Sequence, residues 1–179
     1  MKRIIILLIL ALGIGCSTTT AAQRGDAAKN KQRDWAVRSA RFLESNPFDD
    51  KAKETRERLT AYMIRVPDIT VNMCGDLIPE MYEKRTRMIL GHAEILAQLG
   101  FGALAAVLQH PEIARDRYAQ DLAGVESALK VYKAVLLRDP TAKRPYLDDL
   151  IAQRDAGTLA DEIKTRTDKC IKIHAYMKR

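Results

Sequence analysis

The strongest constraint on the fold of this chain is the spacing of apolar residues between residues 112 and 138. Apolar side chains recur there at alternating intervals of four and three, which places them along one side of an α-helix; they are Tyr118, Leu122, Val125, Leu129, Tyr132 and Leu136. A second row on the same segment is small to medium in size and comprises Gly124, Ala128, Val131 and Val135. Because two faces are apolar, we predict a central helix with a close neighbour on its small-residue side.

Most other segments also have helical periodicity, and prolines separate several of them. The sequence predicts helices near residues 27–45, 50–65, 77–98, 101–109, 112–138, 145–155 and 159–177. Gly157 is placed to close the sixth of these, since glycine readily adopts the left-handed conformation that ends helices. Only residues 66–74 (VPDITVNMC) alternate as an extended segment would, and no second segment offers a partner strand. We therefore predict an all-α fold, a compact bundle of about six to seven helices in which this segment is a buried connection.

Part of the central segment resembles the second helix of a tetratricopeptide repeat. The spacing that this family uses for its packing alanine, its aromatic residue, the next apolar pair and the closing proline is matched by Ala128, Tyr132, Val135, Leu136 and Pro140. The resemblance implies helical hairpins that form a superhelical scaffold with a protein-binding concave side. The alternative is convergent packing of one helix pair, because the prolines do not recur at the family's period of about 34 residues.

The N-terminal residues have the layout of an export signal. Lys2 and Arg3 precede an apolar run from Ile4 to Gly15, which at twelve residues is shorter than the roughly 20 that a membrane-spanning helix needs. Small and polar residues follow and predict a flexible tether. The expected organisation is a signal peptide over residues 1–15, a flexible linker over 16–30 and a single α-helical domain over 31–179.

The end of this run resembles the signal peptides of bacterial lipoproteins, in which a small residue precedes a cysteine that is diacylated and becomes the first mature residue. Gly15 and Cys16 match that arrangement. The resemblance implies lipidation of Cys16 and attachment to a membrane, and Ser17 implies forwarding to the outer membrane, facing the periplasm. Two alternatives stay open: ordinary cleavage near Ala22, which would give a soluble periplasmic or secreted protein, and an uncleaved anchor.

Export would place the other two cysteines in an oxidising compartment, where a pair can form a disulfide. Cys170 falls on the apolar stripe of the last predicted helix, with Leu159 and Ile163, and Cys74 ends the extended segment. We predict a Cys74–Cys170 bond that clamps this segment onto the last helix. The alternative is two buried free thiols.

Two arginines and one histidine form the candidate binding site. Arg85 and Arg166 occupy positions that their helical stripes would give to apolar residues, and His92 lies on an apolar face. If they converge on one cleft, they could bind an anionic ligand. The alternatives are arginines that reach solvent or form structural ion pairs, and a hydrogen-bonded core histidine.

Motifs for catalysis, metals and cofactors are weak. The stretch GFGALA from Gly100 to Ala105 matches a dinucleotide-binding fingerprint but follows a helical pattern instead of the required strand, so we interpret Gly100 and Gly102 as a break between helices. His92 has no second histidine within helical reach and no paired cysteines after it. We therefore predict no metal site and no cofactor, and favour a non-enzymatic role.

Basic residues mark the last predicted helix, in a chain with a net charge of +7. Lys169, Lys172, Lys178 and Arg179 could form a basic surface, although a solvated face is the simpler interpretation. Because export would separate the protein from nucleic acid, we predict no nucleic-acid partner. Two function classes remain: a lipid-anchored envelope scaffold or accessory subunit that binds a protein partner, and a periplasmic binding or catalytic domain with a polar cleft around Arg85, His92 and Arg166.

Overall fold

The computed structural model describes residues 19–71, 74–83 and 87–177, with side chains described between residues 25 and 172 of these ranges. Its contacts divide the chain into two units, Met1–Arg33 and Asp34–Arg179. The first unit contains the beginning of helix α1 (Thr19–Ser45), and the second contains the rest of α1 and all later elements. The prediction of an all-α fold is confirmed, because every regular element of the described residues is helical.

The later α-helices of the described ranges are α2 (Ala52–Arg65), α3 (His92–Gln109), α4 (Arg117–Arg138), α5 (Pro145–Asp155) and α6 (Leu159–Met177). Short 3₁₀ helices form η1 (Gly75–Leu77), η2 (Pro79–Tyr82) and η4 (Pro111–Arg115). The observed α5 and α6 have the predicted bounds. Gly157 ends α5 as predicted, with a φ of 78° and with the Thr158 N–H donating to the Gln153 carbonyl at 2.9 Å. None of the helices in the described residues is both long and apolar enough to cross a bilayer.

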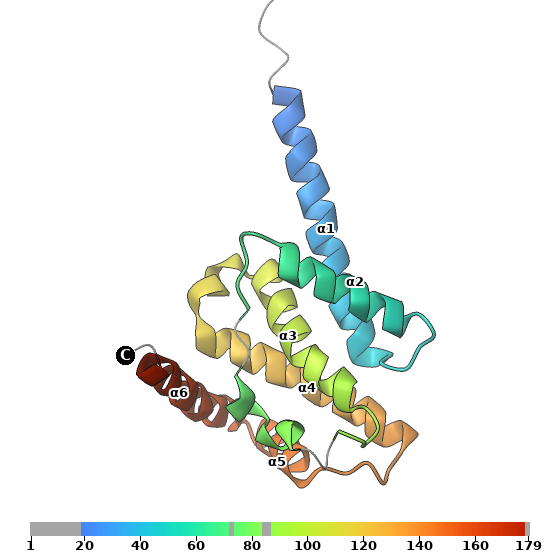
Figure 1. Ribbon diagram of the computed structural model, residues 1–179, viewed down its shortest axis with the longest axis vertical. Coiled ribbons are helices and arrows are strands. Elements are labelled where there is room, and N and C mark those ends of the chain that lie inside the picture. The colour runs from blue at the N-terminus through green and yellow to red at the C-terminus, as the bar shows by residue number, and fades with distance from the viewer. Residues whose placement is uncertain (1–18, 72–73, 84–86, 178–179) are drawn as a thin grey trace, which may run out of the picture. The chain divides into compact units, whose positions relative to one another are not determined.

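Helices α3 and α4 cross closely at the centre of the second unit (Figure 1). A Cβ atom placed on Gly124 would lie 2.5 Å from the carbonyl oxygen of Leu99. One placed on Gly102 would collide with the Ser127 side chain and approach the Ala123 carbonyl oxygen to 2.9 Å. Each helix therefore uses a glycine to let the other approach, and α3 is the neighbour predicted on the small-residue side of α4.

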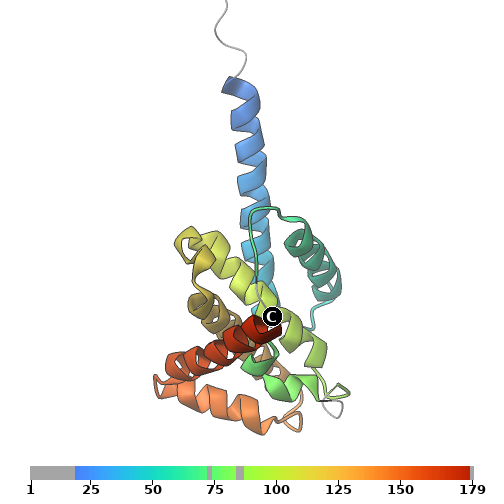
Figure 2. The same ribbon diagram turned by 60° about the vertical axis from the view of Figure 1, so that its left-hand side comes forward.

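Different sides of α3 contribute to two apolar clusters, with α2 on one side and α5 and α6 on the other (Figures 1 and 2). One cluster joins α1, α2 and α3 through Ala36, Ala40, Leu43, Ala52, Leu59, Phe101, Leu104 and Ala105. The other joins Ile95 and Leu99 of α3 to buried residues of η1, η2, α4, α5 and α6. In α4, Val125, Leu129 and Tyr132 of the predicted stripe are buried, which confirms that this helix is central.

The predicted helix over residues 77–98 is wrong in its first half. The described residues before His92 form 3₁₀ helices and turns. Pro79 begins η2, where its missing N–H removes a helical donor, and Gly91 has a φ of 77°, a left-handed conformation that interrupts a helix. Met88 is 93% exposed and Leu90 is 37% exposed, so the apolar residues of this stretch do not share one buried face.

The predicted break at Gly100 and Gly102 is also wrong, because α3 continues through both residues to Gln109. Glycine lowers intrinsic helix stability, but here it permits the close contact with α4. The central helix starts later than predicted: η4 precedes it, and Asp116 caps α4 by accepting a hydrogen bond from the Ala119 N–H at 3.1 Å.

Helix α1 begins at Thr19, whereas the sequence predicted a flexible linker over residues 16–30. The helical part of this stretch contains Ala21, Ala22, Ala27 and Ala28 together with glutamine, lysine and arginine. These are strong helix formers, so local propensity supports a helix where no apolar stripe predicts one. Residues 16–18 lie outside the described ranges.

Candidate functional site

Cys74 and Cys170 are joined by a disulfide, as predicted, with their Cα atoms 6.1 Å apart. Both residues are 3% exposed. The bond connects the start of η1 to α6, so it attaches the irregular chain after α2 to the last helix. Cys16, the predicted lipidation site, lies outside the described residues.

Arg166 lies beside this bond, and its guanidinium serves structural contacts. Nε donates to Glu162 Oε1 at 2.6 Å, and Nη1 donates to the Asp76 carbonyl at 3.1 Å. The guanidinium carbon also lies 4.8 Å from the centre of the Tyr146 ring. These contacts match the structural ion pair that we kept as the alternative to anion binding.

The other members of the predicted sites are only partly described. His92 is the first residue of α3 and is half-buried. Arg85 lies outside the described residues, so convergence of Arg85, His92 and Arg166 stays a prediction. Lys169 and Lys172 are exposed on α6, whereas Lys178 and Arg179 are not described.

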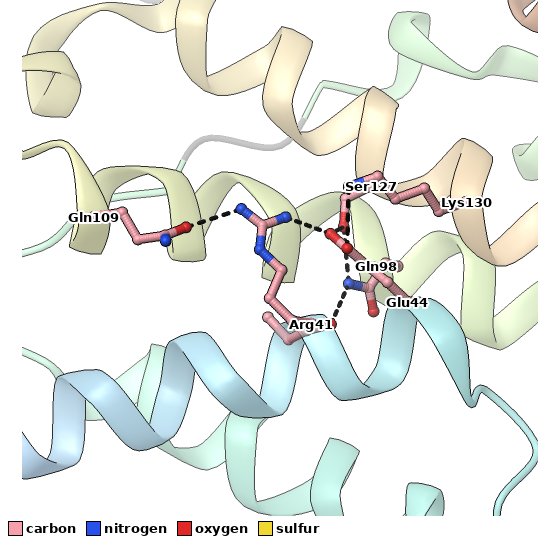
Figure 3. A network of polar contacts seen from close by, with 7 residues as sticks. Arg41, Glu44, Gln98, Gln109, Ser127 and Lys130 are labelled. Carbon is pink, nitrogen blue, oxygen red and sulfur yellow. Dashed lines mark hydrogen bonds and ion pairs between the residues drawn. The ribbon is translucent and has the colours of Figure 1, made fainter.

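A polar network around the buried Glu44 connects α1, α3 and α4 (Figure 3). Glu44 is 6% exposed, and its carboxylate accepts hydrogen bonds from Arg41 at 2.6 Å and Ser127 at 2.7 Å. Lys130 Nζ lies 3.1 Å from the second carboxylate oxygen. Gln98 extends the network by donating to Ser127 Oγ at 2.8 Å and to the Ala40 carbonyl at 3.0 Å.

The Glu44 network fixes the position of the second-unit part of α1 on the α3–α4 pair. A buried carboxylate is costly unless cations and donors compensate it, and removing one partner leaves an uncompensated charge. Sequence reasoning missed this network. A signal was present, because Glu44 continues the helical row of Ala36 and Ala40, where an apolar residue would be expected.

A second buried carboxylate, Asp121 of α4, accepts a hydrogen bond from Thr167 of α6 at 2.8 Å. Its side chain is 1% exposed, and Arg117 Nε lies 3.6 Å from it. Burial raises the pKa of Asp121, against the opposing effects of Thr167 and Arg117. This pair attaches α6 to α4 through Thr167, three residues before the disulfide-bonded Cys170.

Arg144, which precedes α5, is fully buried at 0% exposure. Its backbone N–H donates to the Tyr132 hydroxyl at 2.7 Å, and this hydroxyl donates to Asp148 at 2.8 Å. Burial raises the pKa of Tyr132 to about 12 and lowers the pKa of Arg144. The guanidinium donates to Met81 Sδ at 3.4 Å; its Nε and Nη2 atoms have no hydrogen-bond partner among the described residues.

A hollow of about 460 Å³ lies next to this region and is lined by Pro79, Glu80, Glu83, Pro145 and Tyr146. Arg144 is not among the lining residues. The Tyr146 hydroxyl is engaged by donating to the Leu77 carbonyl at 2.9 Å.

No protein-family model, no curated protein and no solved structure matches this chain significantly. The resemblances to bacterial lipoproteins and to tetratricopeptide repeats therefore stay predictions that depend on the residues that carry them.

Proposed function

We propose that this chain is an exported, lipid-anchored helical protein of the bacterial cell envelope, which acts as a scaffold or accessory subunit by binding another protein. The observation that carries the export part of the proposal is the Cys74–Cys170 disulfide, because persistent disulfides are typical of oxidising compartments. The sequence supports the same location through the apolar run from Ile4 to Gly15 and the cysteine that follows it.

The contacts of the polar side chains favour a structural role over catalysis. Arg166 is engaged by Glu162, Asp76 and Tyr146, so its donors serve the fold. The engagement of Arg166 weakens the alternative function, which is a binding or catalytic domain with a polar cleft around Arg85, His92 and Arg166. For protein binding, the surface offers Met88 at 93% exposure as an apolar point of contact.

Intact-mass measurement of the protein purified from membranes tests the anchor. We expect a mature chain that begins at Cys16 and carries the mass of the lipid. The control is Cys16→Ser, which removes the acceptor thiol and should give a chain without lipid. A wild-type chain that begins near Gln23 and carries no lipid would show ordinary secretion and contradict the anchor.

Extraction of the tagged native protein in mild detergent, followed by quantitative mass spectrometry, tests the scaffold role. We expect one envelope protein in near-stoichiometric amount. Met88→Asp should reduce its recovery at least about tenfold, which corresponds to 1.4 kcal/mol of binding free energy. Ala152→Asp adds the same charge at an exposed site on α5 and should have no effect. Recovery of no stoichiometric partner would contradict the proposal.

A further inference from the structure

The methionines whose side chains the structure describes differ sharply in exposure. Met88, in the turn before α3, is 93% exposed, whereas Met81 of η2 is 1% exposed. Met63 of α2 is half-buried and packs against the apolar cluster of α1, α2 and α3. Among these side chains, the thioether of Met88 is therefore the one that a dissolved reagent reaches most freely.

Met81 shows how the fold protects a sulfur atom. Arg144 Nη1 donates to Met81 Sδ at 3.4 Å, and Met81 belongs to the apolar cluster that includes buried residues of α4, α5 and α6. A reagent must open this cluster before it can reach the Met81 sulfur. Met88 lies further along the same irregular segment, so this segment contains one protected thioether and one accessible thioether.

Methionine sulfoxide formation is a common oxidation of protein side chains and is compatible with an oxidising compartment. We propose that Met88 is an oxidation site for peroxides, at which sulfoxide formation switches off binding of the protein partner. This inference rests on the proposed function, which uses Met88 as a contact with that partner. In the reaction with hydrogen peroxide, the O–O bond breaks, one oxygen atom bonds to Met88 Sδ and the other leaves as water. The sulfur atom loses two electrons and the peroxide gains them, so no further reactant is needed.

Oxidation changes the contact without disturbing the core. The methionine side chain is flexible and apolar, whereas its sulfoxide is polar and accepts hydrogen bonds. In the free protein, the sulfoxide of the exposed Met88 remains solvated by water. In an apolar interface, the same group would lose that water, and burial of an unpaired polar group is costly. The oxidised protein therefore stays folded but binds its partner more weakly.

The rate of oxidation tests the site. The full-length native protein is purified in mild detergent and treated with hydrogen peroxide, and its peptides are mapped by mass spectrometry at intervals. In the folded protein, we expect Met88 to gain its oxygen atom at least about tenfold faster than Met81, because packing excludes peroxide from the buried sulfur. In the protein unfolded by guanidinium, the two rates should become similar. Equal rates in the folded protein would overturn the oxidation site.

Capture from a detergent extract of cell envelopes tests the switch. Peroxide treatment of the tagged wild-type protein should lower recovery of its stoichiometric partner at least about tenfold, the loss also expected for Met88→Asp. Met88→Leu retains an apolar side chain of similar volume without sulfur, so its recovery should be the same before and after treatment. Circular dichroism checks that each sample is folded.

Two results would overturn the switch: full recovery by the wild-type protein with oxidised Met88, or an equal loss in treated Met88→Leu, which would assign the effect to another residue. Absence of a stoichiometric partner for the untreated wild-type protein would contradict the proposed function and the switch together. The oxidation rates of Met88 and Met81 would still decide whether Met88 is the oxidation site, so the two failures are distinguishable.

Discussion

The α3–α4 pair and the described residues between Val66 and Gly91 are stabilised in different ways. The helix pair packs through a repeating pattern of small and apolar side chains, with Gly102 and Gly124 at the closest points. The irregular segment also buries Leu77, Ile78 and Met81, but its backbone is attached by a few specific bonds, namely the disulfide and the hydrogen bonds from Arg166 and Tyr146 to its carbonyls. Helices pair their own backbone groups, whereas irregular chain needs partners supplied from elsewhere.

Removing the disulfide should have the largest effect and should act first on the irregular segment. Cys170→Ala opens a link between residues separated by 96 positions, which should lower the free energy of unfolding by about 4 to 5 kcal/mol in the chain-entropy model. Denaturant titration measures this loss, with Cys16→Ser as the control. Hydrogen exchange should show faster opening of η1 and η2 than of α3 and α4. An equal increase in hydrogen-exchange rate in all helices would contradict the proposed difference between the irregular segment and the α3–α4 pair.

Leu129→Ala tests the contribution of apolar packing to the α3–α4 pair. Leu129 is 0% exposed on α4, and truncation of such a side chain should cost about 2 to 5 kcal/mol. Leu137→Ala on the same helix is the matched control, because Leu137 is 88% exposed and its loss should change stability by less than about 0.5 kcal/mol. Similar costs for the two variants would show that the assignment of the α4 faces is wrong.

Gly102→Ala tests the close approach of α3 and α4. The added Cβ would collide with Ser127, and such overpacking should cost about 1 to 3 kcal/mol in thermal or chemical unfolding. Gly25→Ala is the control, because a Cβ there meets no atom within 4 Å. That variant should be neutral or slightly stabilising through helix propensity. A neutral Gly102→Ala would mean that the two helices do not need the glycine.

Tyr146→Phe removes one hydrogen bond from the irregular segment and retains the ring beside Arg166. Loss of the donor to the Leu77 carbonyl should cost about 1 kcal/mol. The hydroxyl of Tyr118, a residue that is 37% exposed, donates to Asp168 at 2.7 Å. Tyr118→Phe should cost only about a few tenths of a kcal/mol, because water can replace this exposed bond. Equal denaturation midpoints for the two variants would contradict the dependence of the segment on single bonds.

The smallest expected effect is a pH dependence from Asp121. Because burial raises the pKa of this carboxyl in the folded state, the folded protein binds the proton more tightly than the unfolded chain does. The contribution of Asp121 to the free energy of unfolding is therefore greatest at acid pH. It declines as the pH rises from the ordinary carboxyl pKa to the raised pKa of the folded state. Asp121→Asn cannot ionise, so the stability difference between variant and wild type should move in favour of the variant over that interval. A constant difference, measured by urea titration at each pH, would contradict the raised pKa.

Local patterns predicted much of the fold and less of the candidate site. The bounds of α5 and α6 and the buried stripe of α4 follow from helical periodicity and from the residues that start and end helices. The same patterns failed between residues 77 and 91, where we predicted an α-helix but the described residues form 3₁₀ helices and turns and Met88 is exposed. The prediction of a helix break at Gly102 was also wrong, because the sequence does not distinguish a glycine that breaks a helix from one that lets a neighbouring helix approach.

The sequence by itself determined that this protein is helical, that α4 has two apolar faces and that Cys170 faces the core, because helical spacing is a property of neighbouring residues. Only the tertiary structure decided that Cys170 meets Cys74 across 96 positions, that Glu44 meets Ser127 across 83 and that Arg166 donates to Asp76 across 90. These contacts depend on how separate helices pack, and periodicity within one helix does not encode the partner that its side chains meet.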